Sequence, residues 1–294
     1  MSRMPRAHRL RLLAFVAALA AVPPLLVGCA SASPAPALPD GLTVSIKQGR
    51  LDVPAGRLVV HFENRGATAV TIESFVLDIP TLEPGLERSE PIELDAGDAI
   101  DIRLDLPASV CDAEPSPVEV DLTVATADGD REGRLVADDP FDTVARVNAA
   151  DCLGESVAAV AALVMPEHLR STGAGPERRA FIDVRVEPVA SGGGSMRIER
   201  VYGTTLLNAE DGIDWTLGLD VAAGDAPFTI SLPVRPARCD AHAIADDKRG
   251  TILPFEIATD DGRAGRLDVP SDNGLKAELY AYYGERCGLA VPAG

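Results

Sequence analysis

The amino-acid sequence predicts an all-β chain that contains two tandem β-sandwich domains. Apolar and polar residues alternate over short segments, turn-forming residues separate these segments, and markers of the first half recur in the second half. Alternation with a period of two is typical of strands with one buried face, and strands spaced about ten residues apart are typical of sandwiches.

The alternating segments occur in both halves, and we expect six to eight strands in each. They cover residues 58–63, 102–106 and 118–124 in the first half, and 181–186, 196–201 and 229–234 in the second. The first strand of the first half is expected at residues 42–46. Sequences that favour tight turns separate the strands: Asn64-Arg65-Gly66, Ala96-Gly97-Asp98, Asp128-Gly129, Ser191-Gly192-Gly193-Gly194 and Asp261-Gly262.

The two halves match each other in four places and in the same order. The segments DIRLDLPASVCDA (101–113) and TISLPVRPARCDA (229–241) align without a gap, which places Cys111 on Cys239. The remaining matches are TIE (71–73) with RIE (197–199), AGDA (96–99) with AGDA (223–226), and ATADGDREGRL (125–135) with ATDDGRAGRL (258–267). We interpret the chain as a tandem duplication.

The chain has five cysteines, and four of them are expected to form two disulfides. Cys29 belongs to the N-terminal sequence described below and is expected to carry lipid. The other four cysteines are an even number, as expected for disulfides of an exported protein in an oxidising compartment. Their spacing and the repeat favour Cys111–Cys152 and Cys239–Cys287, one bridge in each half. No C-x-x-C pair is present, so we do not expect the four cysteines to bind zinc. We assign no metal ligands and expect no cofactor.

Two segments are ambiguous. Residues 155–164 are Ala-rich and could be helical on propensity, but the repeat places them where residues 42–46 lie, and we therefore expect a strand. Residues 276–283 fit either a short helix or a final strand. Trp215 is expected to fill the second core.

The two halves resemble immunoglobulin-like sandwich domains in their strand pattern. The immunoglobulin pattern places a Trp between its two cysteines, whereas Trp215 precedes Cys239. The resemblance therefore implies an architecture and carries no motif.

The first 28 residues read as a signal peptide. Four arginines (Arg3, Arg6, Arg9 and Arg11) precede an apolar stretch at residues 12–26, which is too short for a spanning helix. It ends in Leu26-Val27-Gly28-Cys29, which resembles the lipobox of bacterial lipoproteins of the actinobacterial type. The resemblance implies cleavage before Cys29 and acylation of that cysteine. We expect a flexible tether at residues 29–40, a first sandwich at 41–153 and a second at 154–294.

The charge of the mature chain excludes some partners. Removing the four arginines of the signal leaves 23 basic residues against 45 acidic ones, a net charge near −22. Nucleic acid is not an expected partner because phosphate contacts need basic clusters. Binding to an anionic membrane surface is also not expected, so the lipid on Cys29 must hold the protein at the membrane.

One charged segment is the candidate binding site. It begins at Cys239-Asp240-Ala241-His242 and resembles a C-D-x-H-x(3)-[DE]-D-K-[RK]-G signature of uncharacterised secreted actinobacterial proteins, a resemblance that implies no function. Its candidate residues are His242, Asp246, Asp247, Lys248 and Arg249. They fit a polar turn, a recognition surface for a protein or glycan, or a metal or catalytic pair formed by His242 with Asp246 or Asp247.

No catalytic motif accompanies this histidine. We therefore expect a non-enzymatic lipoprotein on the extracytoplasmic face of the cell membrane, with a binding or envelope-structural role and an envelope protein or glycan as its partner. The alternative is a ligand- or metal-handling accessory lipoprotein with its site around His242.

Overall fold

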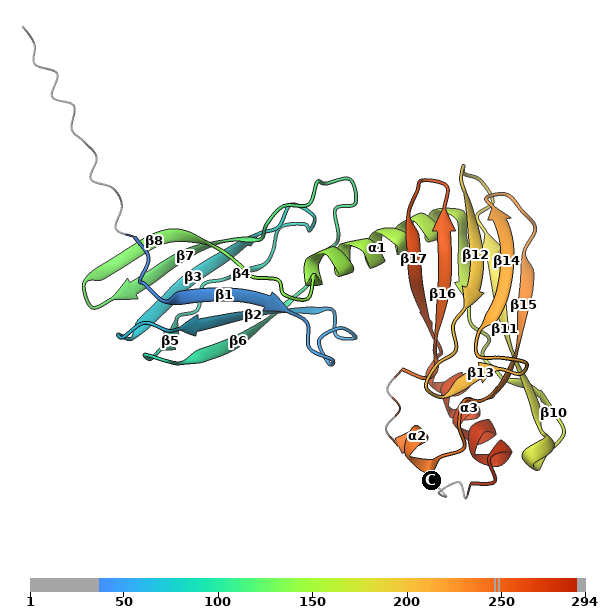
Figure 1. The fold of residues 1–294 in the computed structure, drawn as a ribbon. Helices are drawn as coiled ribbons and strands as arrows, with labels where there is room; N and C mark the ends of the chain where they lie inside the picture. The colour runs from blue at the N-terminus through green and yellow to red at the C-terminus, as the bar shows by residue number, and fades with distance from the viewer. Residues whose placement is uncertain (1–36, 246, 248, 290–294) are drawn as a thin grey trace, which may run out of the picture. The chain divides into compact units, whose positions relative to one another are not determined.

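In the described residues, the fold consists of two β-sandwiches, three α-helices and one 3₁₀ helix (Figure 1). The computed structural model describes residues 37–245, 247 and 249–289. Buried apolar side chains form two separate clusters, one drawn from residues 42–137 and the other from residues 153–283. The predicted all-β class with two tandem immunoglobulin-like sandwiches is confirmed.

The first sandwich has eight strands in two antiparallel sheets. One sheet has the order β1-β2-β6, and the other has the order β4-β3-β7-β8 with β5 also paired to β3. The strands are β1 (Leu42–Lys47), β2 (Arg57–Asn64), β3 (Val70–Asp78), β4 (Glu87–Arg88), β5 (Ile92–Leu94), β6 (Ala99–Asp105), β7 (Glu119–Thr126) and β8 (Gly129–Val136).

The alternation of β2 shows why this segment forms a strand. Leu58, Val60 and Phe62 are fully buried, whereas His61 faces outward. Phe62 packs against Phe75 of the opposite sheet, with ring centroids 5.0 Å apart. The two sheets therefore enclose one core, as the period of two predicts.

The second sandwich has nine strands, one more than the upper limit that we expected. Its sheets have the orders β10-β11-β15-β13, with β9 paired to β11, and β14-β12-β16-β17. The elements are β9 (Ala161–Val164), β10 (Arg170–Thr172), the 3₁₀ helix η1 (Gly175–Glu177), β11 (Arg179–Pro188), β12 (Ser195–Val201), β13 (Leu207–Ala209), β14 (Trp215–Ala222), β15 (Phe228–Pro236), α2 (Ala241–Ala245), β16 (Ile252–Thr259), β17 (Ala264–Pro270) and α3 (Asn273–Arg286).

The strand pairing repeats between the two sandwiches. The sheet β1-β2-β6 corresponds to β9-β11-β15, and the series β3-β7-β8 corresponds to β12-β16-β17. The matched triplets TIE and RIE even carry the same irregularity, because the pairing register shifts between Ile72 and Ser74 in β3 and between Ile198 and Arg200 in β12. A shared bulge at matched positions supports the duplication inferred from the sequence.

A glycine in the last strand of each sandwich shows the same correspondence. Leu38, which precedes β1, lies against Gly133 of β8, and Leu153, which precedes β9, lies against Gly265 of β17. A Cβ atom on Gly133 would approach the Leu38 side chain to 2.7 Å. In each sandwich, a leucine from the preceding segment therefore packs where the strand has no side chain.

The strand expected at residues 155–164 is wrong over most of its length. Helix α1 (Thr143–Val160) continues to Val160, and only Ala161–Val164 form the strand β9, which pairs with β11 as β1 pairs with β2. The Asp139 carboxylate accepts hydrogen bonds from the first backbone amides of the helix. Capping and the helix propensity of the Ala-rich segment outweigh the repeat here. Helix α1 also spans the boundary expected between residues 153 and 154.

The second ambiguous segment is a helix. In α3, Asp272 caps the N-terminus by accepting a hydrogen bond from the amide of Leu275 at 2.7 Å, and Leu275, Leu279 and Tyr282 are fully buried. Trp215 is 5% exposed and donates its indole N–H to the Pro233 carbonyl at 2.7 Å, which confirms its expected place in the second core.

Candidate functional site

The candidate segment follows Cys239 in the connection between β15 and β16. It begins with the short helix α2, where the Asp240 carboxylate accepts a hydrogen bond from the amide of His242 at 2.9 Å. The side chain of His242 is exposed, and within the described chain no hydrogen bond involves it. Two of the five candidate residues, Asp246 and Lys248, lie outside the described residues.

Asp247 has structural partners on both carboxylate oxygens. Oδ1 accepts hydrogen bonds from the amides of Gly250 at 2.6 Å and Arg249 at 3.3 Å, and Oδ2 accepts one from the Tyr280 hydroxyl at 2.8 Å. Burial, together with the nearby Asp247 carboxylate, raises the pKa of Tyr280. Asp247 therefore shapes the turn and fastens it to α3.

The charged segment ends at Gly250, where the fold leaves no space for a side chain. A Cβ atom there would lie 2.5 Å from the Cβ of Leu206 and 2.6 Å from Oδ1 of Asp247, closer than real side chains approach. A residue without a side chain is therefore needed for this turn to close against Leu206.

Arg249 forms an ion pair with Asp268 of β17. The three described candidates thus contact different groups: His242 faces solvent, Asp247 holds the turn and Arg249 pairs with the sheet. Across the residues that the structure describes, no three His, Cys, Asp or Glu side chains are arranged to hold a metal ion. These contacts agree best with the polar-turn interpretation of the segment.

Both expected disulfides are present. Cys111 bonds to Cys152 with Cα atoms 5.4 Å apart, and Cys239 bonds to Cys287 with Cα atoms 5.2 Å apart. In each sandwich the bridge begins in the loop after a corresponding strand, β6 or β15. It ends at Cys152 within α1 in the first sandwich and at Cys287, directly after α3, in the second. Cys29, the predicted lipidation site, lies outside the described residues, and none of the described helices is long and apolar enough to cross a membrane.

The other two described histidines pair with carboxylates. His61 Nδ1 lies 2.7 Å from Asp101, which also binds Lys47 on the outer face of the first sandwich. His168 Nδ1 lies 2.8 Å from Glu278 of α3, and this hydrogen bond raises the pKa of His168. No local pattern in the sequence indicates the His168–Glu278 pair, because its partners are 110 residues apart.

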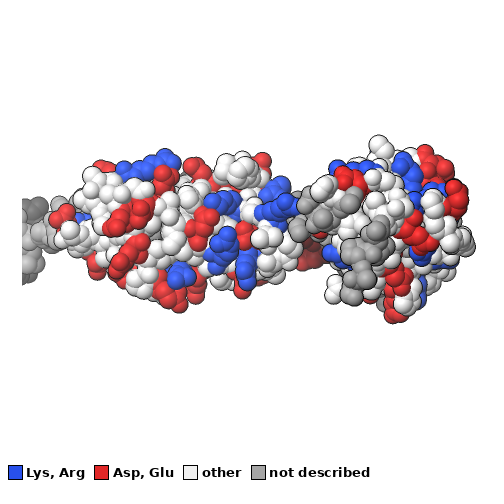
Figure 2. All heavy atoms as spheres, turned by 90° about the horizontal axis from the view of Figure 1, so that it is seen from below, with Lys and Arg blue, Asp and Glu red and all other residues white. Residues whose placement is uncertain are grey.

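Most arginines on the sheet faces are also paired with carboxylates. Arg134 lies 2.7 Å from Asp121 across β7 and β8, and Arg170 lies 2.5 Å from Asp183 across β10 and β11. Figure 2 shows acidic and basic side chains mixed on the face in view. Pairing across strands therefore neutralises many of the basic groups of this acidic chain.

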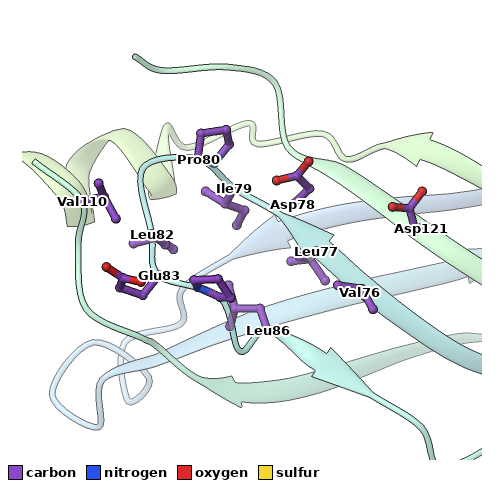
Figure 3. A pocket seen from close by; sticks show the side chains of 11 residues that line it. Val76, Leu77, Asp78, Ile79, Pro80, Leu82, Glu83, Leu86, Val110 and Asp121 are labelled. Atoms are coloured by element: carbon purple, nitrogen blue, oxygen red, sulfur yellow. The ribbon is translucent and has the colours of Figure 1, made fainter. Parts of the chain in front are cut away.

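A hollow of about 470 Å³ lies in the first sandwich. It lies at the end of β3 and along the connection to β4, with an apolar floor that includes Ile79, Leu82 and Leu86 (Figure 3). Carboxylates of Asp78 and Asp121 lie at one end and Glu83 at the other, and none of the lining residues is basic. Sequence reasoning missed this hollow because its lining comes from three separate segments.

Comparisons with known proteins show a distant likeness of fold. No protein family and no curated protein matches the sequence. Among solved structures, the red sea bream transglutaminase is 13% identical over 79% of this chain and 32% of its own, with a TM-score of 0.23. The exo-chitosanase CsxA of Amycolatopsis orientalis is 11% identical over 78% of this chain and 26% of its own, with a TM-score of 0.21.

A third structure, the calcium-binding domain CBD12 of CALX1.1, is 12% identical over 79% of this chain and 88% of its own, with a TM-score of 0.19. The chain spans about a third of the transglutaminase and about a quarter of the chitosanase. Likeness at this level carries no argument about activity or ligands.

Proposed function

We propose that the protein is a lipoprotein held on the extracytoplasmic face of the cell membrane by lipid on Cys29. The observation that carries the proposal is the use of the five cysteines. Two disulfides engage four of them, one pair in each sandwich, and Cys29 at the lipobox-like sequence is the fifth. Disulfides form and persist in oxidising compartments, which supports export of the chain.

We further propose a non-enzymatic role in binding or in the structure of the envelope, with an envelope protein or glycan as the partner. Sandwiches commonly bind partners through exposed loops on a rigid framework. The exposed His242 and its neighbours on the same connection are the proposed contact. The alternative of a metal-handling site is less favoured, because both oxygens of Asp247 are already engaged.

The anchor is tested by fractionating cells that produce Cys29→Ala, with Ser31→Ala as a matched control in the tether. The unmodified chain and the control are expected in the detergent-extracted membrane fraction. Cys29→Ala is expected in the medium, or in the membrane with its signal uncut. A cleaved Cys29→Ala chain that remains in the membrane fraction would contradict the anchor.

The binding role is tested by crosslinking on intact cells, followed by mass spectrometry, with a photoreactive residue in place of His242. A partner that is recovered reproducibly, and is lost with Arg249→Ala, supports the proposal. Recovery of no reproducible partner contradicts the binding role and leaves the anchor untouched.

A further inference from the structure

The loop between β1 and β2 presents an apolar side chain to solvent. Leu51 is 77% exposed, more than any other large apolar side chain of the described residues, and Val53 beside it is 43% exposed. Arg50, which precedes Leu51, is exposed and forms no ion pair with a described residue. Exposure of a leucine side chain to water is unfavourable relative to its burial.

This loop is held firmly at its base. Asp52 is only 5% exposed, and its carboxylate accepts hydrogen bonds from the Gly49 amide and from Nε of Arg103, each at 2.9 Å. The Asp52 carbonyl also accepts a hydrogen bond from the amide of Arg57 at 3.0 Å. Leu51 is therefore presented by an ordered turn.

The hollow of Figure 3 complements this loop, because it combines apolar side chains with carboxylates. Val76 at its side is 46% exposed, and Pro80 and Pro84 of the lining are also exposed. The leucine and isoleucine side chains of the floor are already buried within the chain. Asp78 and Glu83 form no ion pairs within the described part of the chain, whereas Asp121 is engaged by two nitrogens of Arg134, each at 2.7 Å. Two carboxylates thus face this apolar hollow without a cation.

We propose that the Arg50–Val53 loop of one molecule docks into the Asp78/Glu83 hollow of a second copy. Leu51 and Val53 cover the exposed apolar side chains of the hollow, which are Val76, Pro80 and Pro84. Arg50 pairs with Glu83 or Asp78. No residue of the loop lines the hollow of its own chain. A second copy is the proposed occupant because its Arg50 complements the charge of the two carboxylates. The loop and the hollow are different surfaces, so the contact is head-to-tail and can extend into chains.

The contact is small, so the association is weak in solution. Molecules that are confined to one surface associate more strongly, because confinement raises their effective concentration. It goes beyond the proposed function and does not require lipid on Cys29. Self-association can therefore be measured on the exported chain that carries Cys29→Ser, which keeps the tether and both sandwiches.

Sedimentation velocity over a wide range of concentrations, up to near-millimolar, tests the proposal. The sedimentation coefficient of the Cys29→Ser chain, with loop and hollow unchanged, is expected to rise with concentration. Leu51→Asp changes the loop, and the pair Asp78→Lys with Glu83→Lys changes the hollow; each is expected to weaken association about tenfold or more. Ile213→Asp is the matched control, because Ile213 is 66% exposed on the other sandwich.

Mixing the two variants separates a head-to-tail contact from other kinds of association. Each variant alone is expected to remain monomeric, whereas an equal mixture forms a one-to-one dimer, because one partner keeps its hollow and the other keeps its loop. Thermal unfolding checks that each variant is folded. The proposal would be overturned if the sedimentation coefficient of the Cys29→Ser chain, with loop and hollow unchanged, did not depend on concentration. Unchanged association of Leu51→Asp, or a mixture that stays monomeric, would also overturn it.

Discussion

The hydroxyl of Tyr280 donates a hydrogen bond to Oδ2 of Asp247 at 2.8 Å and thereby joins helix α3 to the charged turn after α2. The other oxygen of Asp247 closes the turn itself through the amide of Gly250. A carboxylate engaged in this way is poorly placed to bind a ligand. The relationship identifies Asp247 as a structural member of the candidate segment.

We expect Tyr280→Phe to lower the free energy of unfolding by about 1–2 kcal/mol, because it leaves one oxygen of a partly buried carboxylate without its donor. Urea unfolding measures the change. His242→Ala is the control in the same segment, and its exposed side chain predicts a change within about 0.5 kcal/mol. Equal free energies of unfolding for the two variants would show that the hydrogen bond does not stabilise the fold.

Gly250→Ala should destabilise the protein by about 1–3 kcal/mol, because the new Cβ meets Leu206 and Asp247 at 2.5 and 2.6 Å. Gly193→Ala is the matched control, since nothing lies within 4 Å of the corresponding Cβ position. Thermal unfolding compares the two variants. The steric argument fails if Gly250→Ala melts at the same temperature as the control.

Replacing Cys239 and Cys287 together with serine should lower the stability of the protein by about 4 kcal/mol on the chain-entropy description of disulfides, given their separation of 48 residues. Chemical unfolding under non-reducing conditions measures the loss. Added reductant should bring the unmodified chain to a similar or lower stability, because it also opens Cys111–Cys152. A variant as stable as the oxidised chain would contradict this role.

Asp261 gives a pH-dependent prediction. Hydrogen bonds from Ser156 at 2.6 Å and Thr259 at 2.5 Å lower the pKa of its carboxyl to about 2. Because the folded pKa lies below the ordinary value of 3.8, the stabilisation is present above about pH 4 and is lost as the pH falls towards 2. Ser156→Ala removes the largest cause and should raise this pKa, which a carbon-detected NMR titration can follow. An unchanged titration would contradict the assignment.

The strands and the disulfides could be predicted because their signals are local or repeated. Leu58, Val60 and Phe62 alternate with polar neighbours, and Cys111 aligns with Cys239 without a gap. The repeat predicts a strand where the Ala-rich residues 155–160 form the end of helix α1, so it could not reveal this helix. The His168–Glu278 pair and the hollow depend on residues that only the folded chain brings together, and no local pattern could reveal them.

The charged segment was recognised from its sequence, but its role was not. The structural roles of Asp247 and Gly250 depend on a turn that packs against Leu206 and α3. The spacing of residues 242–250 in the sequence does not reveal these contacts. Motifs of charged residues in acidic chains are therefore best interpreted after their hydrogen bonds are known.

Intact-mass and peptide mass spectrometry of the N-terminus of protein purified from membranes tests the central proposal most directly. The proposal predicts that the chain begins at Cys29 and that this cysteine carries a diacylglyceryl group. A chain that begins elsewhere, or that begins at Cys29 with a free thiol, would contradict the lipid anchor.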